Sequence, residues 1–91
     1  MSQYKLKLYI LRNDIKSRKA EENIMSICNE YLDGLCDLEV IDIERHPDKA
    51  EEDGILAVPT LIKKAPLPET RLIGALDFKS RVLAGLGLQA K

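Results

Sequence analysis

Apolar and polar residues alternate along the first segment of the chain, residues 4–11. One face of this segment carries only aromatic and aliphatic residues, namely Tyr4, Leu6, Leu8 and Ile10. The other face begins with Lys5 and Lys7 and continues with Tyr9 and Leu11. A period of two residues predicts a β-strand, and the apolar second half predicts that this end of the strand is covered on both faces.

A spacing of three and four residues between apolar positions follows a polar break at residues 12–17. This spacing predicts a helix of about five turns with one apolar stripe. Asn13, Asp14 and Ser17 are candidates for its N-cap, and Gly34 is the expected C-terminal stop. The apolar stripe consists of Ala20, Ile24, Ile27, Cys28, Tyr31, Leu32 and Leu35.

The next segment, residues 38–43, is short, apolar and rich in β-branched residues, which predicts a central strand. A strand, a long helix and a second strand predict a right-handed βαβ unit whose two strands are parallel. Pro47 then favours the start of a shorter helix, because the N–H that proline lacks has no partner in a first turn. That helix is strongly polar and ends at Gly54.

Prolines and glycines divide the second half of the chain into short elements. We predict a third strand at residues 58–62. Pro59 lies near its start, a position that suits proline because proline has no N–H to donate to a strand ladder. Residues 63–69 predict a loop, and residues 71–73 predict a fourth strand, antiparallel to the third, that ends at Gly74. The N-cap and apolar residues of a last helix are Asp77, Phe78, Val82, Leu83 and Leu86.

The predicted order of elements is βαβαββα in one domain, residues 1–91. This is the order of a thioredoxin-like α/β domain with a mixed sheet. In such folds a cis-proline precedes the third strand and packs against the start of the first helix. We therefore hypothesise a cis peptide bond between Val58 and Pro59.

Positive and negative charges are nearly balanced, with 14 basic residues, 15 acidic residues and a formal net charge of −1. This balance argues against a nucleic-acid-binding protein, for which a clear basic excess is expected. No apolar run approaches the ~20 residues that span a membrane, and the N-terminus lacks the apolar stretch of a signal peptide. We expect a cytoplasmic protein that binds neither nucleic acid nor membranes, and whose modest core would gain stability from self-assembly.

A thioredoxin-type enzyme needs a thiolate at the start of its first helix, where the helix dipole lowers the thiol pKa. Residues 13–16 occupy that place and contain no cysteine. Cys28 lies on the apolar stripe and Cys36 lies past the helix end, eight positions away. We interpret them as a buried small residue and a loop thiol, with a regulatory disulfide or a sensor thiol as the alternative. The sequence predicts no enzymatic activity, and a thioredoxin-like redox or oxidative-stress protein is the alternative.

No cofactor or metal site is predicted. His46 precedes Pro47 as a turn residue or helix cap, without the oriented partner that a catalytic base needs. The carboxylates after it are spread over several helix faces and are interrupted by Lys49, which indicates a solvated surface. These carboxylates are Asp48, Glu51, Glu52 and Asp53.

Lys63, Lys64 and Arg71 place positive charges on the predicted hairpin that carries Pro66 and Pro68. One interpretation is ordinary surface charge. The other is a docking edge for an acidic surface of a partner protein.

Several segments resemble the KaiB family. Residues 4–10 resemble its opening strand, and the most distinctive stretch is residues 50–61, Ala-Glu-Glu-Asp-Gly-Ile-Leu-Ala-Val-Pro-Thr-Leu. The resemblance covers nearly the whole chain without a gap. Its remaining segments are residues 40–43, Pro47, residues 66–68, residues 71–74 and residues 82–86.

The resemblance implies a non-enzymatic regulator that binds a KaiC-type ATPase ring, in circadian-type timing or in stress adaptation. It also implies two folds. One is a ground state with a rearranged C-terminal half that assembles into dimers or tetramers, and the other is a thioredoxin-like monomer that binds the ring. A stand-alone relative of the sensor domain of a clock histidine kinase is a further alternative. Candidate partner contacts are Lys19, Lys63, Lys64 and Arg71, and candidate structural residues are Pro59, Gly54, Gly74 and Gly85.

This chain departs from the family pattern at a few positions. Family members often carry lysine at the place of Gly54, an arginine pair at the place of residues 70–71, and an acidic residue at the place of Gly87. An acidic C-terminal tail is also expected, and the sequence stops at Lys91. Each departure predicts a weaker partner contact or a changed balance between the two folds.

Overall fold

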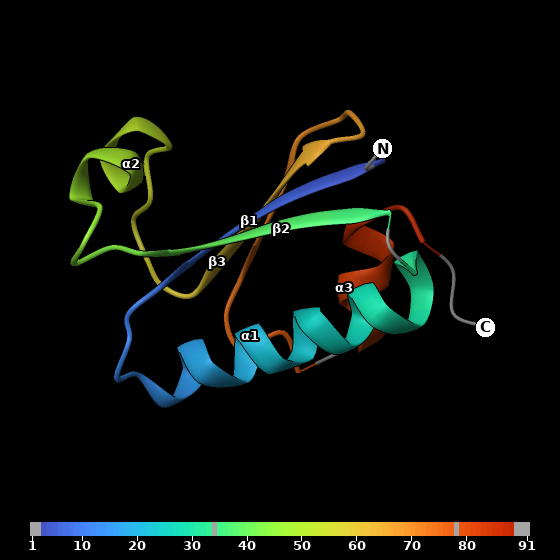
Figure 1. Ribbon diagram of the computed structural model, residues 1–91, viewed down its shortest axis with the longest axis horizontal. Coiled ribbons are helices and arrows are strands. Elements are labelled where there is room, and N and C mark those ends of the chain that lie inside the picture. The colour runs from blue at the N-terminus through green and yellow to red at the C-terminus, as the bar shows by residue number, and fades with distance from the viewer. Residues whose placement is uncertain (1–2, 34, 78, 89–91) are drawn as a thin grey trace.

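The computed structural model describes residues 3–33, 35–77 and 79–88. They form a mixed four-stranded sheet with the strand order β2-β1-β3-β4 (Figure 1). Gly34 and Phe78, which the sequence assigned to a helix stop and to the last helix, lie outside the described residues. The strands are β1 (Tyr4–Ile10), β2 (Cys36–Asp42), β3 (Thr60–Ala65) and β4 (Thr70–Ile73).

Strand β1 lies inside the sheet, and its second half is covered on both faces, as predicted. It pairs in parallel with β2 and antiparallel with β3. Leu6 and Leu8 face the larger hydrophobic core, whereas Tyr9 faces a smaller core on the opposite side of the sheet. All three side chains are almost completely buried.

The prediction of a central strand at residues 38–43 is wrong in one respect, because β2 forms an edge of the sheet. Its parallel pairing with β1 is confirmed. Ile41 is buried, but Val40 keeps 37% of its surface exposed. The β-branched composition therefore supports strand structure here without indicating burial on both faces.

The first helix begins at Asp14, one of the three predicted caps. The N–H of Ser17 donates to Asp14 Oδ2 at 3.0 Å, which satisfies a free donor of the first turn. Helix α1 (Ile15–Ile27) continues into a π-helical turn, η1 (Cys28–Leu32), and Asp33 ends it with a left-handed φ of 30°.

Helices α1 and α3 (Lys79–Gly85) cover one face of the sheet (Figure 1). Gly85 lies against the side chain of Leu72 on β4, where an added Cβ would come within 2.9 Å of both methyl carbons of Leu72. A glycine therefore permits the close approach of α3 to β4. The core on this face contains Leu6, Leu8, Ala20, Ile24, Ile27, Leu61, Leu76, Val82, Leu83 and Leu86.

The short helix α2 (Pro47–Glu52) starts with Pro47 in its first turn, as predicted, and is followed by Gly54 with a φ of +64°. Ala50 and Ile55 pack against the smaller core on the other side of the sheet. None of the described helices is long and apolar enough to cross a membrane. The buried residues of the smaller core are Tyr9, Ile41 and Ile62.

The second half of the chain has longer strand pairing than the sequence predicted. Strand β3 begins after Pro59 and runs to Ala65, so the prediction that Lys63 and Lys64 belong to a loop is wrong. Backbone pairing with β1 and β4 continues past the apolar residues, because ladder hydrogen bonds do not depend on side-chain polarity. The antiparallel pairing of β3 with β4 is confirmed, and the bond between Val58 and Pro59 is cis.

This arrangement is the thioredoxin-like α/β order that the sequence predicted, βαβαββα. The alternative, a ground-state fold with a rearranged C-terminal half, is not the fold of this structure.

Candidate interaction surface

The start of helix α1 is the place where a thioredoxin would carry its reactive thiol. Here Ser17 is only 1% exposed, and its hydroxyl makes two hydrogen bonds. It donates to Asp14 Oδ2 at 3.1 Å and accepts from the N–H of Leu11 at 3.1 Å. Asp14 and Ser17 are therefore joined by capping hydrogen bonds in this turn, and residues 13–16 contain no thiol.

An open groove runs between the first turns of α1 and the segment after β4. Lys19, a predicted partner contact, lines it, and Ile15 beside it keeps 74% of its surface exposed. The other wall is fixed to α1, because Asn23 Nδ2 donates to the carbonyl oxygens of Ala75 and Leu76 at 2.9 and 3.1 Å. The lining residues are Asn13, Asp14, Ile15, Lys16, Lys19, Gly74, Ala75 and Asp77.

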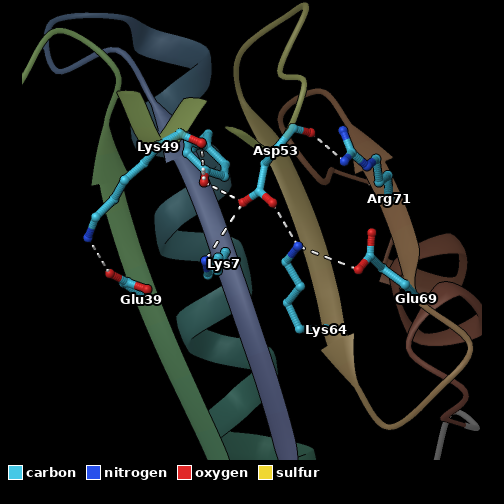
Figure 2. Close-up of polar contacts among 8 residues, drawn as sticks. Lys7, Glu39, Lys49, Asp53, Lys64, Glu69 and Arg71 are labelled. Carbon is cyan, nitrogen blue, oxygen red and sulfur yellow. Dashed lines mark hydrogen bonds and ion pairs between the residues drawn. The ribbon is translucent and has the colours of Figure 1, made fainter. Parts of the chain in front are cut away.

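A charged network lies on the opposite face of the sheet, centred on Asp53 at the end of α2 (Figure 2). Lys64 Nζ lies 2.8 Å from Asp53 Oδ1, and Lys7 Nζ lies 3.7 Å from Asp53 Oδ2. The hydroxyl of Tyr9 donates to Asp53 Oδ2 at 2.5 Å. One carboxylate thus joins α2 to β1 and β3.

Strand β4 joins the same network through Arg71. Its guanidinium donates to the backbone carbonyl of Asp53, at the C-terminal end of α2 (Figure 2). It also donates to the carbonyl of Gly54. A cation is favourable there, because the helix dipole places partial negative charge on the last carbonyls. Glu69 adds a second carboxylate to Lys64 at 3.5 Å.

These contacts shift the ionisation of the buried members. Burial alone would raise the pKa of Asp53, but hydrogen bonds from Lys64 and Tyr9 and the positive charges of Lys64 and Lys7 bring it below its ordinary value. The pKa of Lys64 is raised, chiefly by its hydrogen bond to Asp53. Burial, followed by the hydrogen bond to Asp53, raises the pKa of Tyr9.

The four basic residues predicted as partner contacts do not form one surface. Lys19 lines the groove, whereas Lys64 and Arg71 lie in the Asp53 network. Lys63 is only 5% exposed and faces the same side of the sheet as Leu6, its neighbour on β1. The sequence interpretation of Lys63 as surface charge on a hairpin is therefore wrong for this fold.

The importance of Asp53 was missed, because the sequence interpretation placed it on a solvated helix face. Its side chain is only 12% exposed. The available signal was Tyr9, which occupies an inward position of β1 and carries a hydroxyl that needs a partner when buried. Within the described residues, no group of three or more His, Cys, Asp or Glu side chains could hold a metal ion.

Cys28 and Cys36 lie close together, as the alternative interpretation of a regulatory disulfide requires. Cys36 is the first residue of β2 and not a loop residue, and its sulfur lies 2.8 Å from that of Cys28. Both thiols are partly buried at the rim of the larger core.

These features define the class of protein: a thioredoxin-like domain whose first helix begins without a thiol. The structure is similar to the N-terminal domain of SasA from Synechococcus elongatus, with a TM-score of 0.74 and 18% identity over 100% of this chain and 90% of that one. It is also similar to mitochondrial thioredoxin 3 from Saccharomyces cerevisiae, with a TM-score of 0.76 and 16% identity over 97% and 81% of the two chains. At such low identities these similarities show the fold alone.

The KaiB domain profile matches residues 7–88. Circadian clock protein KaiB3 from Synechocystis sp. is 41% identical over 88 residues, which are 97% of this chain and 86% of the relative. Circadian clock oscillator protein KaiB from Synechococcus elongatus is 45% identical over 85 residues, which are 93% and 83% of the two chains. The chain therefore belongs to the KaiB family.

Proposed function

We propose that the chain is a non-enzymatic regulator that binds a KaiC-type ATPase ring in a circadian-type timing system. Family membership combined with the thioredoxin-like arrangement carries the proposal, because the family resemblance assigns ring binding to that fold. The two relatives compared above both carry circadian clock names, which favours timing over stress adaptation.

Binding is a better account of this domain than thioredoxin-type redox catalysis. A reactive thiolate needs the dipole and free N–H groups of a helix start. In this chain the Asp14 carboxylate accepts from the N–H of Ser17 at the helix start, residues 13–16 contain no cysteine, and Cys28 lies at the other end of α1. An insulin-reduction assay tests the alternative: reductase activity that disappears when both cysteines are changed to alanine would favour a redox enzyme.

The groove beside α1 is the surface that we propose for the ATPase. It offers the positive charge of Lys19 next to the exposed side chain of Ile15, a combination suited to a partner segment with acidic and apolar residues. Lys64 and Arg71 are secondary contacts in this proposal, since they already hold Asp53 and its backbone carbonyl.

Self-association is the second interaction that we propose. Leu56 and Leu67 are 99% and 80% exposed, and burial of such side chains between copies would add to a modest core. Gel filtration of the free protein at several concentrations tests this proposal. A dimer or tetramer supports it, and a monomer at every concentration contradicts it.

The test of ring binding uses the purified chain and a hexameric KaiC-type ATPase in ATP and in ADP. We expect co-elution on gel filtration in at least one nucleotide state. Lys19→Glu should weaken binding by about tenfold, which corresponds to ~1.4 kcal/mol. Arg18→Glu is the matched control, because Arg18 is exposed on the same helix but does not line the groove. Absence of co-elution in both nucleotides contradicts the proposal.

A further inference from the structure

Two thiols from different elements meet at the end of α1 that is remote from the groove. Cys28 opens the π-helical turn η1, and Cys36 opens strand β2. Their sulfur atoms lie 2.8 Å apart, and both cysteines are free. Lys19 lies nine residues before Cys28, a separation of about 13 Å along a helix, so the thiol pair is distinct from the proposed ring-binding surface.

The backbone holds both cysteines in place. The N–H of Asp33 donates to the carbonyl of Cys28 at 3.0 Å, and the N–H of Leu35 donates to the carbonyl of Leu32 at 2.6 Å. The N–H of Tyr4 donates to the carbonyl of Leu35 at 2.8 Å, which ties the start of β2 to β1. The proximity of the two sulfurs therefore follows from a hydrogen-bonded turn and strand start.

We propose that Cys28 and Cys36 form a reversible intramolecular disulfide, so that this pair is a redox modification site of the chain. Bonded sulfurs lie ~2.05 Å apart, so the reduced pair needs an approach of less than about 1 Å. The site lies outside the surface proposed for the ATPase and does not depend on ring binding.

The surroundings of the two sulfurs raise the pKa of both thiols. Burial is the main cause at Cys36 and at Cys28. Alkaline pH therefore favours the thiolate that begins the exchange.

The oxidant in this scheme is a low-molecular-weight disulfide. The thiolate of one of the two cysteines attacks one sulfur of that disulfide, forms a mixed disulfide and releases one small thiolate. The other cysteine then loses its proton to this thiolate or to water, attacks the protein sulfur of the mixed disulfide and releases the second small thiol. Two protein thiols are oxidised to one disulfide, and one small disulfide is reduced to two thiols.

The experiment uses the full, reduced chain with oxidised glutathione at about pH 8.5, the ordinary pKa of a thiol. Intact mass, a non-reducing gel and peptide mapping report the product. We expect a monomer that has lost two hydrogen atoms, carries a Cys28–Cys36 cross-link and returns to the reduced mass with dithiothreitol. In Cys28→Ser, glutathione should remain on Cys36, because no resolving thiol is present.

Three results on the unsubstituted chain would overturn the proposal: glutathione that stays attached without an internal bond, disulfides between chains, or no modification at all. The mass of the unsubstituted chain decides the question even where a serine variant fails to fold. Because no ATPase is present, failure of this test is distinguishable from failure of the proposed function.

Discussion

The hydroxyl of Tyr9 donates a hydrogen bond to Asp53, which lies 44 positions later in the chain, at a distance of 2.5 Å. Tyr9 belongs to the inner strand β1, and Asp53 ends helix α2. Lys64 from β3 binds the same carboxylate, and Arg71 from β4 binds the carbonyl of the same residue. Asp53 thus adds a side-chain link between the second half of the fold and β1, beside the ladder that pairs β1 with β3.

Replacement of Asp53 by asparagine should lower the free energy of unfolding by about 1–2 kcal/mol at pH 7. Asparagine keeps an acceptor for Tyr9 but loses the charge that pairs with Lys64 and Lys7. Urea denaturation followed by circular dichroism measures the difference. Glu51→Gln is the matched control on the same helix, where an exposed side chain should change stability by less than about 0.5 kcal/mol.

The effect of Asp53→Asn should depend on pH in a defined direction. The folded pKa of Asp53 lies below its ordinary value of about 4, so the stabilisation is complete above that value. It is lost as the pH falls through the folded pKa. The free energies of unfolding of the unsubstituted chain and of Asp53→Asn should therefore differ most near neutral pH and become similar in acid. A difference that persists unchanged at about pH 2 contradicts the role of the ionised Asp53 carboxylate.

Tyr9→Phe should cost about 1–2 kcal/mol, because the ring stays buried while Asp53 loses its hydroxyl donor. The folded pKa of Tyr9 is raised, so its stabilisation is complete below about pH 10 and declines as the pH rises further. Urea titrations at neutral and alkaline pH measure the free energies of unfolding of the unsubstituted chain and of Tyr9→Phe. The difference between them should become smaller above about pH 10. In the Asp53→Asn background the same substitution should cost less, because the two residues interact directly.

Local sequence patterns were sufficient to predict the helices and strands whose formation depends on residues close together in the sequence. The alternation in β1, the helical spacing of α1, the Asp14 cap and the Pro47 start all act within a few residues, and the structure confirms them. The parallel pairing of β1 with β2 followed from connection rules for such units.

The site could not be predicted in the same way, because its contacts join distant segments. Tyr9 and Asp53 are 44 positions apart, and Lys63 becomes buried only when β3 pairs with both β1 and β4. The contact between Cys28 and Cys36 depends on how η1 turns the chain into β2. Each of these contacts is set by the tertiary arrangement, which residue spacing alone does not reveal.

Two glycines with positive φ should differ in their tolerance of alanine. Nothing lies within 4 Å of a Cβ added at Gly54 or Gly74, so only the backbone distinguishes them. Gly54 has a φ of +64°, within the left-handed region, where an L-residue costs ~1–2 kcal/mol. Gly74 has a φ of +110°, outside that region, so Gly74→Ala should lower the free energy of unfolding more than Gly54→Ala does. Urea denaturation of both variants measures the order, and a larger cost at Gly54 contradicts it.

If the chain binds a KaiC-type ATPase as proposed, Asp53→Asn should also weaken that binding. The substitution leaves the residues of the groove that carries Lys19 unchanged. Asp53 joins α2, β3 and β4, which belong to the half of the chain that the family resemblance expects to rearrange. If the substitution destabilises the thioredoxin-like fold by ~1.4 kcal/mol relative to the rearranged fold, the population ratio of the two folds changes tenfold. The apparent Kd should then rise by up to about tenfold where the thioredoxin-like, binding fold is the minor form.

The kinetics separate this population effect from loss of a direct contact. A smaller population of the binding fold slows association, whereas dissociation should change little because the groove with Lys19, the main proposed contact, is unaltered. Biolayer interferometry with Asp53→Asn, with Glu51→Gln as the control, measures both rates. Faster dissociation with unchanged association would mean that Asp53 contacts the ATPase directly. In that case Asp53 itself would belong to the docking surface, and its main role would not be to hold the fold that docks.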